Sequence, residues 1–239
     1  MKKAFLNWSS GKDAAYALYL LQQQKEFNVE KLVATINSEN YRVSMHGLRK
    51  ELLLKQADSI GISLHLISLA GNVPLSDYNK IMEKETLQLK EEGFTHSIFG
   101  DIFLEDLRQY REQQLQKVEI QPIFPLWKKD TAQLMQEFLS AGFKAITVSV
   151  NAKLLNQSFC GRLIDESFFA DLPEGVDPAG ENGEFHTFVF DGPIFSDSVT
   201  FQKGEIVERS FAPVKKQDDN CFKKQPEAWD TRFYYCDLF

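Results

Sequence analysis

Five consecutive residues near the start of the chain could bind a phosphate: Ser9, Ser10, Gly11, Lys12 and Asp13, between a predicted strand and a predicted helix. Small residues let backbone N–H groups approach an anion, and the helix N-terminus adds a partial positive charge. Lys12 supplies a mobile cation, and Asp13 could cap the helix or hold a magnesium ion. The spacing of these residues differs from that of two better-known nucleotide-binding motifs, G-x-x-x-x-G-K-S/T and G-x-G-x-x-G. The segment predicts a phosphate site, with a capped surface turn as the alternative.

A second group of candidates, Glu181, Glu184 and His186, lies in a segment that reads GENGEFHTFVFDGPIF over residues 180–195. Side chains two residues apart face the same side of a strand, so Glu184 and His186 are predicted to lie together and Thr187 to face the other way. A carboxylate beside an imidazole could bind ammonium and accept its proton, which makes these three residues catalytic candidates. The alternative is an acidic loop that pairs with lysine or arginine elsewhere.

Further charged residues follow a predicted strand at residues 95–99. Asp101 could bind Mg²⁺ or a substrate hydroxyl, or it could cap the next helix, and we predict it as a catalytic and metal-binding residue. Glu105, Arg108 and Glu112 recur at spacings of three and four residues and therefore share one helix face. Such a face is ordinarily a solvated array of ion pairs.

Alternating strand-like and helix-like segments must position these residues. Short runs rich in β-branched and aromatic residues predict strands at residues 3–8, 32–37, 63–69, 95–99 and 145–150. Helical periodicity fills the gaps, and the near copies EEGFTHSIF and SAGFKAITV share one helix–glycine–strand junction. Strand–helix–strand alternation implies parallel pairing with right-handed crossovers. We therefore predict an α/β fold, a Rossmann-like open parallel sheet with helices on both faces and the ligand at its carboxyl edge.

The character of the sequence changes from about residue 171, where DLPEGVDPAGENGE forms a loop rich in proline, glycine and acidic residues. Strand-like runs follow at residues 186–190, 198–201, 206–211 and 232–236, with a hairpin turn predicted at Lys203 and Gly204. These runs predict a smaller β-rich subdomain. We place the domains at residues 1–150 and 151–239, with a soft boundary because no low-complexity linker separates them.

The composition narrows the class of protein. The 239 residues include 27 Lys and Arg against 34 Asp and Glu, so the net charge of −7 argues against a broad grip on nucleic acid. The cysteines Cys160, Cys221 and Cys236 form no C-x-x-C pair, which excludes a cysteine-rich zinc site and indicates a reducing compartment. No apolar run is long enough for a secretory signal or a membrane span. We therefore expect a cytoplasmic protein without a membrane partner.

The loop SSGKD resembles the pyrophosphate loop, usually S-G-G-x-D-S, of the adenine nucleotide alpha-hydrolase superfamily. Ser10 stands where glycine is usual, and Ala14 stands where serine is usual, which removes one hydroxyl. Three further segments resemble the diphthine–ammonia ligase family in their order and separation: GDI at residues 100–102, PLW at residues 125–127, and residues 180–195. The last of these is long and specific, and the resemblance covers most of the chain.

This resemblance implies an enzyme that cleaves ATP to AMP and pyrophosphate, adenylates a carboxylate and lets ammonia displace AMP. Family members form diphthamide on elongation factor 2 in this way, and bacterial homologues, which lack diphthamide, must use another acceptor. The resemblance puts the SSGKD loop on pyrophosphate, Asn37 near adenosine and His46 near the nucleotide, with Mg²⁺ on Asp13 and Asp101. The family pattern also has arginine and glutamate near residue 110, which keeps Arg108 and Glu112 as candidates.

The expected partners are ATP, Mg²⁺, ammonium and a carboxylate acceptor; no nucleic acid is expected, and a homodimer stays open. One alternative is a tRNA-modifying thiolase or lysidine-type ligase, which the acidic charge and the missing C-x-x-C argue against. Another is a nucleotide-binding module without catalysis, which Ala14 supports. Because residues 9–13 and 180–195 lie far apart in the sequence, we expect that each can be altered without disturbing the other.

Overall fold

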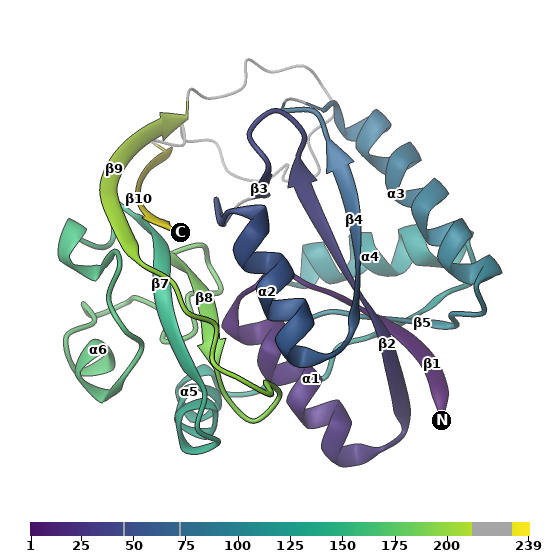
Figure 1. Ribbon diagram of the computed structural model, residues 1–239, viewed down its shortest axis with the longest axis horizontal. Coiled ribbons are helices and arrows are strands. Elements are labelled where there is room, and N and C mark those ends of the chain that lie inside the picture. Colours follow the sequence, from purple (N-terminus) through teal and green to yellow (C-terminus); the bar gives the residue numbers. More distant parts are fainter. Residues whose placement is uncertain (45, 72, 212–230) are drawn as a thin grey trace.

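The computed structural model describes residues 1–44, 46–71, 73–211 and 231–239. These residues form a mostly parallel sheet and an antiparallel sheet, with the helices α1 (Lys12–Gln24) and α2 (Lys50–Ile60) between them (Figure 1). The predicted α/β class with a smaller β-rich part is confirmed.

The first sheet carries the edge at which the predicted phosphate loop lies. Within the described residues its order is β4, β2, β1, β5, β6, all parallel, and β3 pairs antiparallel with the end of β2. The bounds are β1 Lys2–Asn7, β2 Phe27–Asn37, β3 Arg42–Val43, β4 Ser63–Leu69, β5 His96–Ile98 and β6 Gln121–Ile123. Because β1 and β5 are parallel neighbours, the segments that follow them, residues 8–11 and 99–104, meet at the same edge.

Alternate residues of β1 separate two apolar cores. Ala4 and Leu6 join the cluster that contains α1 and α2. Phe5 joins a second cluster with α3 (Leu75–Glu91) and α4 (Glu105–Lys117). Because successive side chains of a strand point to opposite faces, this alternation places helices on both faces of the sheet, as predicted. None of the described helices combines the length and the apolar character needed to cross a membrane.

The second sheet is antiparallel, in the order β8, β7, β10, β9. Its strands are β7 Lys144–Asn151, β8 Phe185–Asp191, β9 Lys203–Phe211 and β10 Thr231–Leu238, and the remaining helices are α5 Thr131–Ser140, η1 Gln157–Phe159 and α6 Glu166–Ala170. Buried residues of β7 and β8 share one continuous cluster with α1 and α2. The second sheet therefore covers the side of these helices that faces away from the first sheet (Figure 1).

The strand predicted at residues 145–150 exists, but the prediction assigned it to the parallel sheet, and this assignment is wrong. It joins the antiparallel sheet as β7, because β8 pairs with one of its edges and β10 with the other. The proposed domain boundary at residue 150 stays a prediction, and the place of β7 favours an earlier boundary. The repeated junction is confirmed, since Gly93 and Gly142 both have φ of +89° after a helix.

Two predictions between β8 and β9 are wrong. Residues 198–201 form no strand; one backbone hydrogen bond, from Val199 N to Phe190 O, holds the segment beside the end of β8. Lys203 and Gly204 begin β9 instead of forming a hairpin turn. The chain is extended there because Gln202 exchanges two backbone hydrogen bonds with Phe239 and leads directly into the β9–β10 ladder.

Candidate functional site

The loop between β1 and α1 has a backbone shape that its own sequence does not impose. Ser10 has φ of +74°, in the left-handed region that residues other than glycine seldom adopt. Its carbonyl oxygen accepts a hydrogen bond from Val189 N at 3.0 Å and another from Gln56 Nε2 at 3.1 Å. Residues from β8 and α2 therefore hold this turn in place.

Gln56 is a positioning residue that the sequence analysis missed. Its side chain is fully buried, accepts from Trp8 Nε1 at 3.0 Å, and also donates to Val189 O at 2.6 Å. One amide thus joins the end of β1, the loop and β8. The signal was present in the sequence, because Gln56 lies on the apolar stripe of α2 between Leu53 and Ile60, where a polar side chain needs partners.

The N-terminus of α1 presents the donors that an anion needs. Gly11 is the N-cap and has no capping side chain, and Lys12 N donates to Thr187 Oγ1 at 3.1 Å. The backbone N–H groups of Ser10 and Gly11 donate to no acceptor among the described residues. Ser10 Oγ is buried and likewise has no partner there. These free donors at a helix N-terminus match the oxygens of a phosphate.

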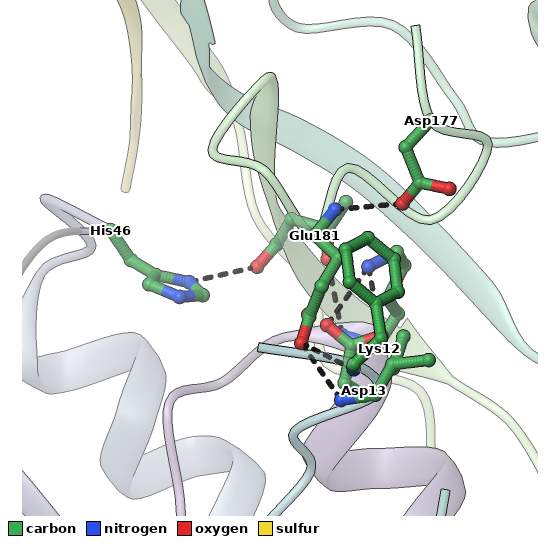
Figure 2. Close-up of polar contacts among 8 residues, drawn as sticks. Lys12, Asp13, His46, Asp177 and Glu181 are labelled. Atoms are coloured by element: carbon green, nitrogen blue, oxygen red, sulfur yellow. Dashed lines mark hydrogen bonds and ion pairs between the residues drawn. The ribbon is translucent and has the colours of Figure 1, made fainter. Parts of the chain in front are cut away.

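Lys12 and Asp13 form an ion pair at this N-terminus (Figure 2). Lys12 Nζ lies 2.8 Å from Asp13 Oδ1, and the Lys12 side chain is only 4% exposed. The ammonium also lies 5.6 Å from the centre of the Phe185 ring. A buried ammonium with one carboxylate partner is positioned to exchange part of that contact for a bound anion.

Two more carboxylates approach this pair, Asp101 after β5 and Glu181 before β8. Gly100 allows the approach, because a Cβ there would lie 2.9 Å from the Asp13 carbonyl carbon. Glu181 Oε1 accepts from Ile102 N at 2.7 Å (Figure 2). Burial, followed by repulsion from Asp13 and Asp101, raises the pKa of Glu181 to about 7. Asp13, Asp101 and Glu181 thus lie in one region around Lys12.

Asp101 pairs with Arg111 of α4, which the sequence analysis also missed. Arg111 Nε lies 2.8 Å from Asp101 Oδ2, and its guanidinium lies 4.3 Å from the centre of the Phe99 ring. Burial raises the pKa of Asp101, and the negative charge of Asp13 adds to this, while Arg111 opposes it. Arg111 is therefore the residue of α4 that enters the site.

Arg108 and Glu112, the residues of α4 that were predicted as candidates, contact each other and, among the described residues, not the SSGKD loop. Arg108 Nε donates to Glu112 Oε1 at 2.7 Å, and the Arg108 guanidinium lies 4.5 Å from the centre of the Trp127 ring. Glu105 lies in the first turn of α4. No described contact joins Arg108 or Glu112 to the SSGKD loop, and their ion pair fits the alternative of a solvated helix face.

Two histidines from distant segments lie together beside the loop. The rings of His46 and His186 have their centres 4.7 Å apart. His46 Nδ1 donates to Thr187 O at 3.2 Å, and Figure 2 shows this contact of His46. A Cβ on Gly11 would lie 2.9 Å from His46 Cε1. Burial and then Lys12 lower the pKa of His186 to about 4, and burial and then His186 lower the pKa of His46 well below its usual value. Both imidazoles are neutral at neutral pH.

The side chains of Glu184 and Asn37 accept hydrogen bonds from residues of their own turns. Glu184 Oε1 accepts from Asp177 N and from Asn182 Nδ2, both at 3.1 Å, while its buried Oε2 has no partner among the described residues. Among the described contacts none joins Glu184 to His186. Asn37 Oδ1 accepts from Glu39 N at 2.7 Å and so shapes the turn after β2.

The expectation that residues 9–13 and 180–195 are independent is wrong. Lys12 N donates to Thr187 Oγ1, Val189 N donates to Ser10 O, and the His46 ring lies between the two segments. The physical reason is that β8 lies against the N-terminal end of α1, so that backbone groups of both segments take part in these hydrogen bonds. A substitution in either segment will therefore be felt in the other.

Comparison with known proteins identifies the family. A family model described as the N-terminal domain of diphthamide synthase matches residues 1–122, and one described as its C-terminal domain matches residues 130–217. The chain belongs to the diphthamide synthase family. The two matched segments of this diphthamide synthase family member contribute the SSGKD loop and β8, which meet at the site.

Relatives named diphthine–ammonia ligase share part of this family member. The one from Bos taurus is 32% identical over 140 residues, which cover 54% of this chain and 52% of that one. The one from Danio rerio is 33% identical over 135 residues, 53% of each chain. The chain therefore spans about half the length of the curated relatives that it matches.

A solved structure, described as a predicted subunit of tRNA methyltransferase from Methanocaldococcus jannaschii, is 15% identical, with a TM-score of 0.42 over 61% of this chain and 80% of that one. At this sequence identity and TM-score, the similarity carries no inference about the fold or function of this family member.

We predict that Gln56→Leu destabilises the protein by about 3 kcal/mol, because Trp8 Nε1 and Val189 O would lose their partner inside the core. Urea denaturation measures the free energy of unfolding. Gln133→Leu is the matched control, since Gln133 lies exposed on α5 and its substitution is expected to change stability by less than about 0.5 kcal/mol. Equal losses for the two variants would contradict the role assigned to Gln56.

We also predict that Glu181→Gln stabilises the unliganded protein increasingly as the pH rises from about 5 to about 8. The raised pKa means that the folded state binds a proton more tightly than the unfolded state, so stability falls as the pH rises through 7. Removing the charge should recover about 2 kcal/mol, or several degrees in Tm. Thermal melts in chelator test this, with Glu112→Gln as the control. The same Tm difference at both pH values would refute the prediction.

Proposed function

We propose that the chain is an ATP-dependent ligase of the diphthine–ammonia ligase type, which adenylates a carboxylate and amidates it with ammonia. The observation that carries this proposal is the unpaired donor set at the N-terminus of α1, with buried Lys12 beside it. Family membership and the names of the relatives support the choice of reaction.

The loop residues fit the pyrophosphate end of ATP. Ser9, Ser10 and Gly11 would surround it with small side chains and N–H groups, and Lys12 would add its charge. Oxygen ligands suit Mg²⁺, which proteins usually hold with one or two carboxylates plus substrate phosphates, so Asp13 and Asp101 are the proposed ligands. Bound there, Mg²⁺ would neutralise charge on the departing pyrophosphate. Among the described residues, no group of three or more His, Cys, Asp or Glu side chains is arranged to hold a metal by itself.

A carboxylate must be turned into an electrophile before ammonia can attack it. Adenylation makes AMP the leaving group, and the enzyme has to orient the acceptor oxygen toward the α-phosphate. Glu181, held by Ile102 N beside the three charges of Lys12, Asp13 and Asp101, lies where it could position that acceptor or take a proton. Its raised pKa suits a group that exchanges a proton near neutral pH.

Neutral imidazoles suit the nucleotide side of the site. His46 lies against Gly11 and His186, and we propose that both rings line the nucleotide, as the resemblance implied for His46. Because its pKa is about 4, His186 is a weak base, and we propose that it contacts the nucleotide instead of deprotonating ammonium.

Glu184 is the proposed ammonium ligand. Its buried Oε2 has no partner among the described residues, and a small cation with four N–H donors would supply one. We place Asn37 near the adenosine because it ends β2 at the edge where the loop begins. Glu112 stays a candidate catalytic residue, which would act by holding Arg108 in place.

The acceptor would be the diphthine carboxylate of elongation factor 2 in a host that makes diphthamide, and a small carboxylate elsewhere. A tRNA acceptor is the second candidate, and tRNA retardation in a gel at physiological salt would favour it. A cytoplasmic location and a homodimer stay predictions.

We predict that Lys12→Met weakens ATP binding by about 2–3 kcal/mol, because one charge-assisted contact to phosphate is lost while the apolar stem is kept. Isothermal titration calorimetry with Mg²⁺ in excess measures the affinity. Lys144→Met serves as the control, since Lys144 lies exposed on the second sheet and pairs with Asp191. Unchanged affinity for Lys12→Met would rule out the phosphate role of this loop.

We predict that the nucleotide products are AMP and pyrophosphate. The reason is the loop itself, whose spacing differs from that of kinase-type phosphate loops. Chromatography of the nucleotide after incubation with ATP, Mg²⁺, ammonium and acceptor decides the matter, and a Lys12→Met preparation controls for contaminating ATPases. Accumulation of ADP would contradict adenylation, and the absence of turnover with every acceptor tried would favour a binding module.

A further inference from the structure

One carboxylate ties the connection between β3 and α2 to β10. Asp237 Oδ1 accepts from Arg42 Nη1 at 2.8 Å and from Arg49 Nε at 3.1 Å, and Arg49 Nη2 donates to the other oxygen. Arg42 begins the two-residue strand β3, and Arg49 is the N-cap of α2, so Asp237 binds both ends of the connection. Hydrogen bonds from Arg49 and Arg42 lower the pKa of Asp237 to about 2, so it is ionised at neutral pH.

The neighbours of Asp237 reinforce this contact from the same side of the chain. A Cβ on Gly47 would lie 3.2 Å from Tyr235 Cδ1, and the Arg49 guanidinium lies 5.6 Å from the centre of the Phe239 ring. Residues 235, 237 and 239 alternate along the segment, and alternate residues face one side of an extended chain. Three successive side chains on that side therefore contact the connection.

The connection carries His46, and Arg42 links it to Asp237. Arg42 Nη1 donates to Gly47 O at 2.7 Å as well as to Asp237, so one guanidinium fixes the backbone next to His46. His46 then contacts Gly11 at the N-cap of α1 and donates to Thr187 O. A continuous path of contacts thus runs from Asp237 to the proposed phosphate site.

We propose that Asp237 is a positioning residue for the nucleotide site, acting through Arg42 and Gly47 to hold His46 against Gly11. The inference rests on the proposed function, since it assigns a purpose to a site that binds ATP. Without the carboxylate, Arg42 and Arg49 would lie side by side without their shared counter-ion, and their mutual repulsion would loosen the connection that carries His46.

The test compares Asp237→Asn with Asp237→Glu and with Asp171→Asn, a control that removes a similar arginine partner, that of Arg162, elsewhere in the second half of the chain. Hydrogen exchange over residues 42–50 reports the connection, and calorimetry with ATP and excess Mg²⁺ reports the site. We expect faster exchange and roughly tenfold weaker ATP binding for Asp237→Asn, partial recovery for Asp237→Glu, and neither change for the control. Thermal melts confirm that each variant is folded.

A double-mutant cycle with His46→Ala separates positioning from a general loss of stability. If Asp237 acts through His46, Asp237→Asn should weaken ATP binding much less in the His46→Ala background than in the wild-type protein. Fully additive losses, or unchanged affinity for Asp237→Asn in a wild-type background that binds ATP, would overturn the inference alone. Failure of the wild-type protein to bind ATP would overturn the proposed function, and with it the role of Asp237 in nucleotide binding.

Discussion

The left-handed backbone at Ser10 is the constraint on which the rest of the site depends. A residue with a Cβ is held at φ of +74° against a steric cost of roughly 1–2 kcal/mol, so surrounding contacts must fix it. The contacts come from the Gln56 amide and from Val189 N, one on α2 and one on β8. The candidate phosphate loop therefore acquires its shape only when both sheets are assembled around α1 and α2.

Charge around Lys12 shows what this frame can bind. Lys12 and Arg111 bring two positive charges, against the carboxylates of Asp13, Asp101 and Glu181. The surrounding histidines are neutral at neutral pH and add no positive charge. A polyphosphate entering this region would meet no net positive charge, so for the proposed reaction we expect its binding to need a divalent cation as well as the loop.

Local signals in the sequence were enough to predict where the residues of the candidate phosphate loop and Asp101 lie in the fold. Small residues after a buried strand, followed by helical periodicity, indicated the loop before α1, and Asp101 was selected because it follows the strand predicted at residues 95–99, which the structure shows as β5, His96–Ile98. β7 could not be assigned from its own sequence, since a buried run looks the same in either sheet and its partners, β8 and β10, lie far along the chain. On α4 the sequence analysis selected Arg108 and Glu112, whereas Arg111 is the residue that pairs with Asp101. A helix that is polar on most sides does not indicate which of its arginines points inward.

The contact between the loop and residues 180–195 changes how the two chemical steps of the proposed reaction can be separated. Thr187 Oγ1 accepts from Lys12 N, and Val189 N donates to Ser10 O, so the segment that carries Glu181 and Glu184 also shapes the loop proposed to bind pyrophosphate. An adenylated acceptor would therefore meet ammonia within the same frame that formed it, without moving to a second domain. By the same reasoning, a change at His186 that lowers the rate of amidation would also alter nucleotide affinity. Only a residue whose contacts stay within its own loop, as those of the Glu184 side chain do, could affect one step alone.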